Sequence, residues 1–190
     1  MTNEETKRRK KTYKIQPSDT AAEEIEKTLE NLLGLEPHPC VVLCIGTDGI
    51  IGDCLGPMVG SMLKEPLAPY GVKVYGTLEE PATARNLEKV VREIHEETPD
   101  CKILAIDAGV GSETEVGTIK ITSVGIRPRS GVGKGMNQVG SCSILGILTE
   151  KRKGDEVMFA IKYIRLREVV RLVKPMAQGV RTYFESRCTL

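Results

Sequence analysis

Aromatic residues and histidine are scarce in this chain of 190 residues. It has no tryptophan, aromatic residues make up only 4% of it, and it has two histidines, His38 and His95. His38 comes just before a predicted strand, at the opposite end of a sheet from the carboxyl ends of its strands, and His95 falls among glutamates of a predicted helix. Neither is placed to activate a nucleophile, so no Ser/His/Asp or Cys/His arrangement can be assembled.

The chain also lacks a charge excess and a long apolar run. Lys and Arg number 27 against 26 Asp and Glu, so no global field favours a nucleic acid or a membrane surface as a partner. No apolar stretch approaches the roughly 20 residues of a membrane span, and no apolar core follows the basic residues near the N-terminus as in a signal peptide. We therefore expect a cytoplasmic protein that binds neither a membrane nor a nucleic acid.

Paired cysteine motifs are missing as well. The six cysteines show no CxxC spacing, and three lie in or beside apolar strand-like runs: Cys40, Cys44, Cys54, Cys101, Cys142 and Cys188. We expect them to be reduced and to act mainly as small buried side chains. Cys54 is the one thiol placed to react, because a helix N-terminus can lower the pKa of a cysteine, but no base is evident near it.

The length and the 40% hydrophobic content suit one domain with a substantial core. Residues 1–17 carry a run of five basic residues at 7–11 and are expected to form a basic mobile tail, with a nucleic-acid arm as the alternative. Residues 18–190 are expected to form a single α/β domain.

Alternating apolar runs and helical patterns dominate that domain. Strands are predicted at 41–45, 72–75 and 103–106, and helices at 18–33, from 55, and at 86–97. Residues 118–122 indicate an antiparallel or edge strand, 142–148 a short helix, 157–166 a strand, and 169–184 a helix with a kink or restart at Pro175. This order predicts a three-layer α/β/α sandwich with a mostly parallel sheet.

Two aspartates, Asp53 and Asp107, lie where apolar strand-like runs give way to glycine-rich loops. Polar groups that leave neighbouring parallel strands converge on one crevice. If the two carboxylates are within hydrogen-bond reach, one keeps its proton and the pair can serve as acid and base through one water. Each can also have a structural role, Asp53 as a helix cap and Asp107 as an acceptor for loop amides.

A second candidate site is the glycine-rich segment 123–135. It lacks the G-x-x-x-x-G-K-[ST] spacing of a phosphate loop, and the loop before Asp53 is not G-x-G-x-x-G, so nucleotide motifs fail. A loop that clamps an extended peptide through main-chain hydrogen bonds is the favoured interpretation, and a plain surface loop is the alternative.

Three segments of the chain resemble the YyaC-type sporulation proteins, a family related to the germination protease that degrades small acid-soluble spore proteins. These are residues 44–57, 103–111 and 123–133. In the germination protease, D-A-L-G-P and I-D-A motifs carry essential aspartates, and the corresponding residues here are Asp53 and Asp107. The third segment matches at residues that the resemblance implies bind substrate: Gly125, Ile126, Pro128, Ser130, Gly131 and Gly133.

The fold is shared more distantly with hydrogenase maturation proteases, in which two acidic residues and a later histidine bind a metal. Here the acids would be Asp53 and Asp107, but the histidine has no counterpart, because the later segment offers Gln138, Ser141 and Cys142. A carboxylate pair alone makes a poor first-row metal site. We therefore expect no metal and no cofactor, although Asp48 with Cys142 or Gln138 leaves a metal-dependent version open.

The resemblance implies a sporulation-associated peptidase that hydrolyses peptide bonds in spore proteins, with Asp53 and Asp107 as its catalytic pair. Its expected partner is a peptide or spore-protein substrate, and a homo-oligomer is left open. The alternative is a catalytically inactive protein of the same fold that binds peptides or regulates sporulation, because a missing histidine is what a protein that lost its activity would show.

Overall fold

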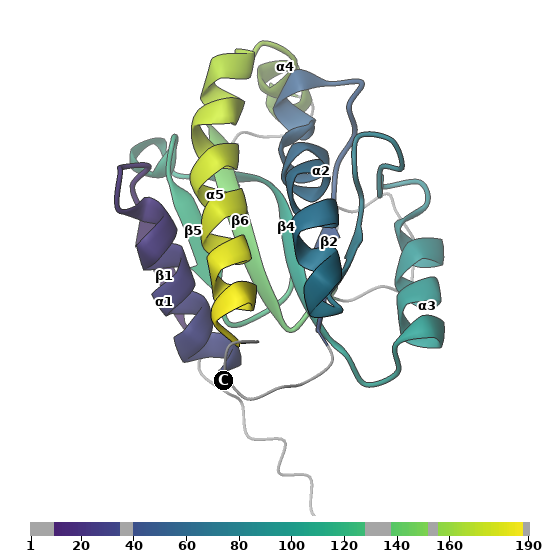
Figure 1. The fold of residues 1–190 in the computed structure, drawn as a ribbon. Helices are drawn as coiled ribbons and strands as arrows, with labels where there is room; N and C mark the ends of the chain where they lie inside the picture. The colour runs from purple at the N-terminus through teal and green to yellow at the C-terminus, as the bar shows by residue number, and fades with distance from the viewer. Residues whose placement is uncertain (1–9, 35–39, 128–137, 152–155, 188–190) are drawn as a thin grey trace, which may run out of the picture.

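The computed structural model describes residues 10–34, 40–127, 138–151 and 156–187 (Figure 1). They form a mixed α/β fold around a six-stranded sheet whose strands lie in the order β1-β5-β6-β4-β2-β3. The strands are β1 (Thr12–Ile15), β2 (Cys40–Cys44), β3 (Lys73–Tyr75), β4 (Lys102–Gly111), β5 (Ile119–Thr122) and β6 (Cys142–Glu150).

The middle of the sheet is parallel. β2 pairs in parallel with β3 and β4, and β4 pairs in parallel with β6. β5 runs antiparallel to both β6 and β1, which confirms the antiparallel prediction for residues 118–122. The sheet is therefore mostly parallel, as predicted. The carboxyl ends of its parallel strands lie on the same side of the molecule.

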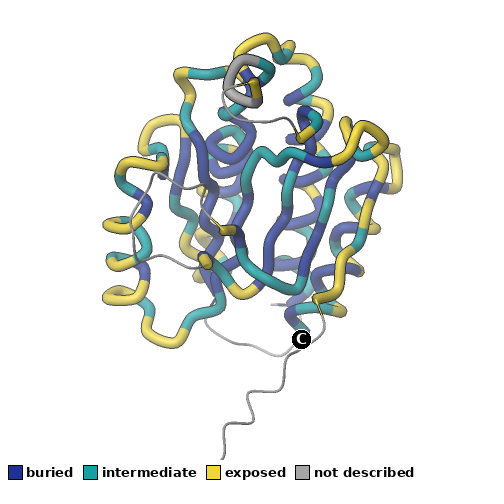
Figure 2. The backbone as a smooth tube through the Cα atoms, turned by 180° about the vertical axis from the view of Figure 1, so that it is seen from behind, coloured by how far each residue is buried: buried dark blue, intermediate teal, exposed yellow. Residues whose placement is uncertain are grey.

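The core is divided into two clusters because alternate residues of each strand point to opposite sides of the sheet. Val42 and Leu104 belong to a core cluster with residues of α1 (Ala21–Leu33), α2 (Leu55–Leu67) and α5 (Leu166–Arg187). Val41 and Ile103 belong to a second cluster with residues of α3 (Leu87–Glu97). The central strands β2 and β6 are buried along most of their length (Figure 2). The helices predicted at 18–33, from 55 and at 86–97 are confirmed.

Two predicted elements are wrong. Residues 142–148 form strand β6 instead of a short helix, and residues 157–166 contain helix α4 (Glu156–Lys162) instead of a strand. β6 lies between β4 and β5 and is buried on both faces, so its apolar run carries no alternation. A short unbroken apolar run does not distinguish a buried strand from a buried helix. α4 contacts β6 and the 3-10 turn at Ile51–Asp53, and its Ile161 is buried.

Three smaller predictions also need correction. The tail predicted over residues 1–17 is too long, because β1 pairs with β5 and Ile15 is buried; residues 1–9 lie outside the described chain. Met62 of α2, which its spacing with Val59 and Leu63 predicts to turn inward, is instead 48% exposed. α5 runs through Pro175 as one helix, without a restart. None of the helices in the described ranges is both long and apolar enough to cross a membrane.

Glu115 holds the β1-β5 side of the sheet together. Its carboxylate accepts hydrogen bonds from the Ser112 backbone N–H (2.9 Å) and from Lys120 Nζ (2.9 Å), and Lys14 Nζ of β1 lies 3.5 Å away. The Ser112 N–H and then Lys120 lower the pKa of Glu115 from 4.5 to about 2. Because the folded-state pKa is depressed, this contribution to stability is present above pH 4.5 and is lost as the pH falls toward 2.

Replacing Glu115 by glutamine is therefore expected to lower the free energy of unfolding by about 2 kcal/mol at pH 7, since hydrogen bonds to a charged group are lost. The difference from the wild type should shrink below pH 4.5 and vanish near pH 2. Urea unfolding across this pH range measures it, with the exposed neighbour Glu113→Gln as the matched control. A difference that does not depend on pH would contradict the assignment.

Candidate functional site

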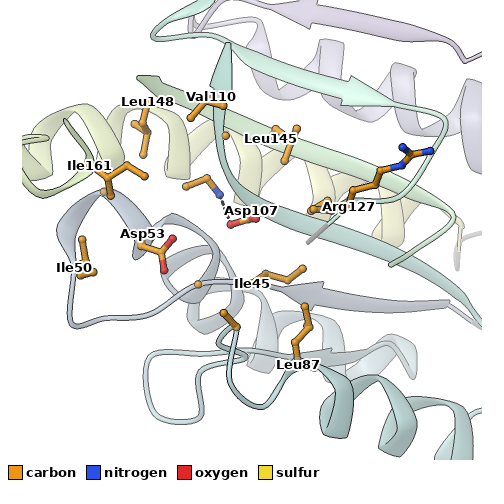
Figure 3. A pocket seen from close by; sticks show the side chains of 16 residues that line it. Ile45, Ile50, Asp53, Leu87, Asp107, Val110, Arg127, Leu145, Leu148 and Ile161 are labelled. Carbon is orange, nitrogen blue, oxygen red and sulfur yellow. Dashed lines mark hydrogen bonds between the residues drawn. The ribbon is translucent and has the colours of Figure 1, made fainter. Parts of the chain in front are cut away.

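A cavity of about 390 Å³ opens where the parallel strands end. Both predicted aspartates, Asp53 and Asp107, line it (Figure 3). The remaining lining residues come from the ends of β2, β4 and β6, from the start of α3, from α4 and from the segment after β5: Ile45, Gly46, Ile50, Gly52, Ala84, Leu87, Ala108, Gly109, Val110, Ile126, Arg127, Leu145, Leu148 and Ile161. The carboxyl ends of parallel strands are where ligands of open α/β sheets bind.

Asp107 is positioned by strand β4. It pairs in register with Leu145 of β6, and its Oδ1 accepts the backbone N–H of Ala108 at 2.7 Å. Two residues further on, the β4-β6 register shifts between Gly109 and Val110. Such irregularities bend a strand and redirect its side chains, and they are common beside active sites. Ala108 belongs to β4 itself, so Asp107 accepts a strand amide instead of the predicted loop amide, and the strand predicted over 103–106 continues to Gly111. The same Asp107 lines the cavity.

Asp53 is positioned by the 3-10 turn Ile51–Asp53 ahead of α2. Its backbone N–H donates to the Ile50 carbonyl (2.8 Å), and its own carbonyl accepts the Thr47 N–H (3.1 Å). Two glycines, Gly46 and Gly52, allow the backbone around Asp53 to pack this closely. A Cβ at Gly46 would overlap the Asp53 carbonyl oxygen, and a Cβ at Gly52 would overlap the Ile161 carbonyl oxygen. Asp53 is therefore held between the end of β2 and helix α4.

The N-cap position of α2 belongs to Cys54 and not to Asp53, which lies one residue before it. The two aspartates thus reach one cavity from different elements, Asp53 from a turn on the α2 side and Asp107 from the middle of the sheet (Figure 3). Their catalytic role remains a prediction.

Only part of the predicted substrate-binding loop lies within the described residues. Ile126 lines the cavity and forms a β-bridge with Val139. Gly125 is beside it, and a Cβ there would overlap the Val139 and Gly140 carbonyl oxygens, so this glycine allows close backbone packing. The other four predicted contact residues lie outside the described residues: Pro128, Ser130, Gly131 and Gly133.

Arg127 and the apolar walls of the cavity were not predicted. Arg127 follows Ile126 and is exposed. Leu145, Leu148 and Ile161 were assigned to elements of the wrong type, so their direction could not be read from the pattern. The only available signal was the apolar run after residue 142, which fits a central strand as well as a helix.

The residues weighed for a metal site do not come together with the aspartates. Cys142 is buried at the start of β6 in the core cluster of α1, α2 and α5, and its register partner Leu104 lies three residues before Asp107. Asp48 and Gln138 are exposed and do not line the cavity. Among the described residues, no three or more His, Cys, Asp or Glu side chains form a group that could hold a metal ion.

The described cysteines are free thiols, and four of the five are buried. Burial raises the pKa of the Cys142 thiol to about 12 and that of Cys40 to about 11. Cys54 donates to the Ile51 carbonyl (3.0 Å), and burial raises the pKa of this thiol too, contrary to the lowering considered for a helix N-terminus. His95 is exposed on α3 and does not line the cavity, as its sequence context predicted.

The amino-acid sequence of this chain matches a known protein family and a known relative. A family model described as "Protein of unknown function (DUF1256)" matches residues 13–179. The chain belongs to this family. It is 34% identical over 173 residues to "Uncharacterized protein YyaC" of Bacillus subtilis (strain 168), an alignment that spans 90% of this chain and 83% of the relative. The predicted YyaC-type resemblance is confirmed, while the link to proteases remains a prediction.

The DUF1256 match contains the whole described cavity. Residues 13–179 include the Asp53 turn, the Asp107 strand, the β6 wall and helix α4. The described residues outside the match are the N-terminal part of β1 and the last turns of α5.

Proposed function

We propose that this member of the DUF1256 family is a sporulation-associated peptidase whose catalytic groups are Asp53 and Asp107. The observation that carries the proposal is that both aspartates, in segments resembling the D-A-L-G-P and I-D-A motifs of the germination protease, line one cavity. We extend the proposal to the fold, as a three-layer α/β/α sandwich of the hydrogenase maturation protease type. The two core clusters on opposite faces of the sheet support that extension.

In the proposed reaction the pair acts through one water molecule. One carboxylate takes a proton from the water as its oxygen attacks the peptide carbonyl, and the other, protonated, aspartic acid donates to the developing oxyanion. Collapse of the intermediate breaks the C–N bond, and a proton passes from the pair to the leaving amine. The products are a carboxylate that contains the water oxygen and a free amine, so atoms and protons balance.

The walls of the cavity support this chemistry. Apolar side chains, among them Ile45, Leu145 and Leu148, surround the carboxylates, and apolar surroundings strengthen interactions between charges. Ile126 and Arg127, at the start of the glycine-rich segment, both line the cavity. We propose that this segment seats an extended peptide by main-chain hydrogen bonds.

The test is incubation of the full chain with an acid extract of spore proteins in water enriched in ¹⁸O. Mass spectrometry should find new peptide termini, with one ¹⁸O atom in each new carboxylate. Parallel reactions with and without a chelator separate a carboxylate-only reaction from a metal-dependent one, which would lose its products in the chelator. An extract that remains intact under all these conditions would overturn the peptidase proposal.

A second candidate is an inactive peptide-binding protein of the same fold. It is favoured by the 2.7 Å hydrogen bond from the Ala108 N–H to Asp107 Oδ1, which is the contact a purely structural aspartate would make. Calorimetry with peptides from the same spore extract distinguishes the two candidates. Saturable binding to wild type without any product, weakened in Asp53→Asn, would support the inactive protein.

A further inference from the structure

Three large apolar side chains are exposed around the corner between α4 and α5. Tyr163 is 70% exposed, Leu166 is 50% exposed, and Ile51, in the turn that carries Asp53, is 44% exposed. Single exposed apolar residues are ordinary on a protein surface, but a group of them beside a cavity marks interaction sites. This corner, residues 162–166 together with Ile51, is here called the α4-α5 corner.

Backbone hydrogen bonds order the α4-α5 corner itself, and close packing at Gly52 joins it to the Asp53 turn. The Tyr163 N–H donates to the Ala160 carbonyl (3.1 Å), and the Glu168 N–H donates to the Arg165 carbonyl (2.9 Å). A Cβ at Gly52 would overlap the Ile161 carbonyl oxygen and lie 2.8 Å from Ile164 Cδ1. Since Gly52 lies between Ile51 and Asp53, the exposed corner and the cavity share one packed unit.

The charge of the corner is positive. Lys162 and Arg165 are both exposed, and neither forms an ion pair with any of the residues that the structure describes. Arg167 is different, since its Nε lies 2.8 Å from Glu168 Oε1. Two unpaired cations thus alternate with Tyr163 and Leu166 along five residues, which gives the corner both apolar area and positive charge.

We propose that the α4-α5 corner is a docking surface for an acidic peptide segment that carries apolar side chains. Charge complementarity with Lys162 and Arg165 selects the acidic residues, and Tyr163 and Leu166 provide apolar contact area of the kind that dominates interface energies. The corner continues directly into the cavity, because Ile161 lines the cavity from the same turn. A segment held there lies next to the entrance of the cavity.

A protein segment fits this surface better than a nucleic acid does. Affinity for nucleic acids grows with the number of phosphates that cations neutralise, and this corner offers two unpaired cations in a chain of net charge +1. Its three exposed apolar residues add contacts that a phosphate backbone does not use. The proposal does not require Asp53 and Asp107 to be catalytic, so it can fail or succeed independently of the peptidase proposal.

Fluorescence anisotropy with labelled peptides tests the docking surface on the full chain. The probes are a synthetic peptide of Glu, Leu, Phe and Gly, the same peptide with Lys in place of Glu, and a single-stranded DNA of equal charge. The acidic peptide should bind at least tenfold more tightly than either other probe, and its affinity should fall as salt rises. Equal affinity for the DNA or for the basic peptide would overturn the proposal.

Paired variants locate the binding. Lys162→Glu with Arg165→Glu should weaken binding of the acidic peptide at least tenfold, and Tyr163→Ser with Leu166→Ser at least fivefold. The charge control is Lys27→Glu with Arg92→Glu on exposed parts of α1 and α3, and the apolar control is Met62→Ser with Val116→Ser, 48% and 43% exposed. Both control pairs should bind within twofold of wild type. Losses in the controls as large as those at the corner would contradict the assignment.

Discussion

Replacing Asp53 or Asp107 by asparagine is expected to lower kcat/KM for spore-protein cleavage at least a thousandfold. Asparagine keeps the size of the side chain but can neither take a proton from water nor hold the shared proton. Because the two groups act as one unit, the double variant should lose little more activity than either single variant. The loss should appear in kcat, since neither substitution removes the apolar walls of the cavity.

Asp48→Asn is the matched control. Asp48 lies in the same loop as Asp53, is exposed and does not line the cavity, so this variant should retain wild-type kinetics. Thermal unfolding of all variants shows whether an activity loss comes from misfolding. Wild-type cleavage by both Asp53→Asn and Asp107→Asn, in stably folded proteins, would end the carboxylate-pair mechanism.

Gly76→Ala is expected to destabilise the protein by roughly 3 kcal/mol or more, the largest stability effect predicted here. Gly76 ends β3 with φ +82°, and a Cβ there would overlap the Cys44 carbonyl oxygen of the neighbouring strand. α2 packs on the same spot, since a Cβ at Gly60 would overlap the Gly76 carbonyl oxygen. An added methyl group must therefore push apart strand β2, strand β3 and helix α2.

Gly71→Ala separates the steric cost from the backbone cost. Gly71 has a similar positive φ of +69°, but no atom lies within 4 Å of a Cβ at this exposed position. Its replacement should cost only about 1 kcal/mol, the penalty for an alanine with left-handed backbone angles. Urea unfolding of both variants measures the difference. Equal decreases in the free energy of unfolding would contradict the prediction, because they would show that the added methyl group at Gly76 has no steric effect.

Elements whose sequence carries a local period were predictable. The stripe of Ile25, Leu29 and Leu33 specifies α1 because only a helix places these residues on one face, and all three are buried. The unbroken run of β2 predicts a strand covered on both sides, and each of its five residues is buried. By contrast, β6 and α4 were exchanged in type, because short apolar runs fit both structures until their neighbours are known.

The edge strand β1 forms because it pairs with β5, and no local sequence pattern predicts this pairing. Residues 12–15 look like the end of a basic tail, yet they form β1 because β5 presents a free edge over a hundred residues later in the chain. Lys14 then meets Glu115 across that edge. A partner so distant in sequence contributes no period or motif to the segment that it orders.

The sequence by itself determined that Asp53 and Asp107 each follow a buried, strand-forming apolar run, because such a run is visible without any knowledge of the fold, although β4 continues past Asp107 to Gly111. Only the tertiary structure decided that the two aspartates line the same cavity and which other residues line it. It also decided that α4 packs against the Asp53 turn. The physical reason is distance along the chain. The cavity joins residues from 45 to 161, and their contacts depend on strand order, register and helix packing rather than on local preference.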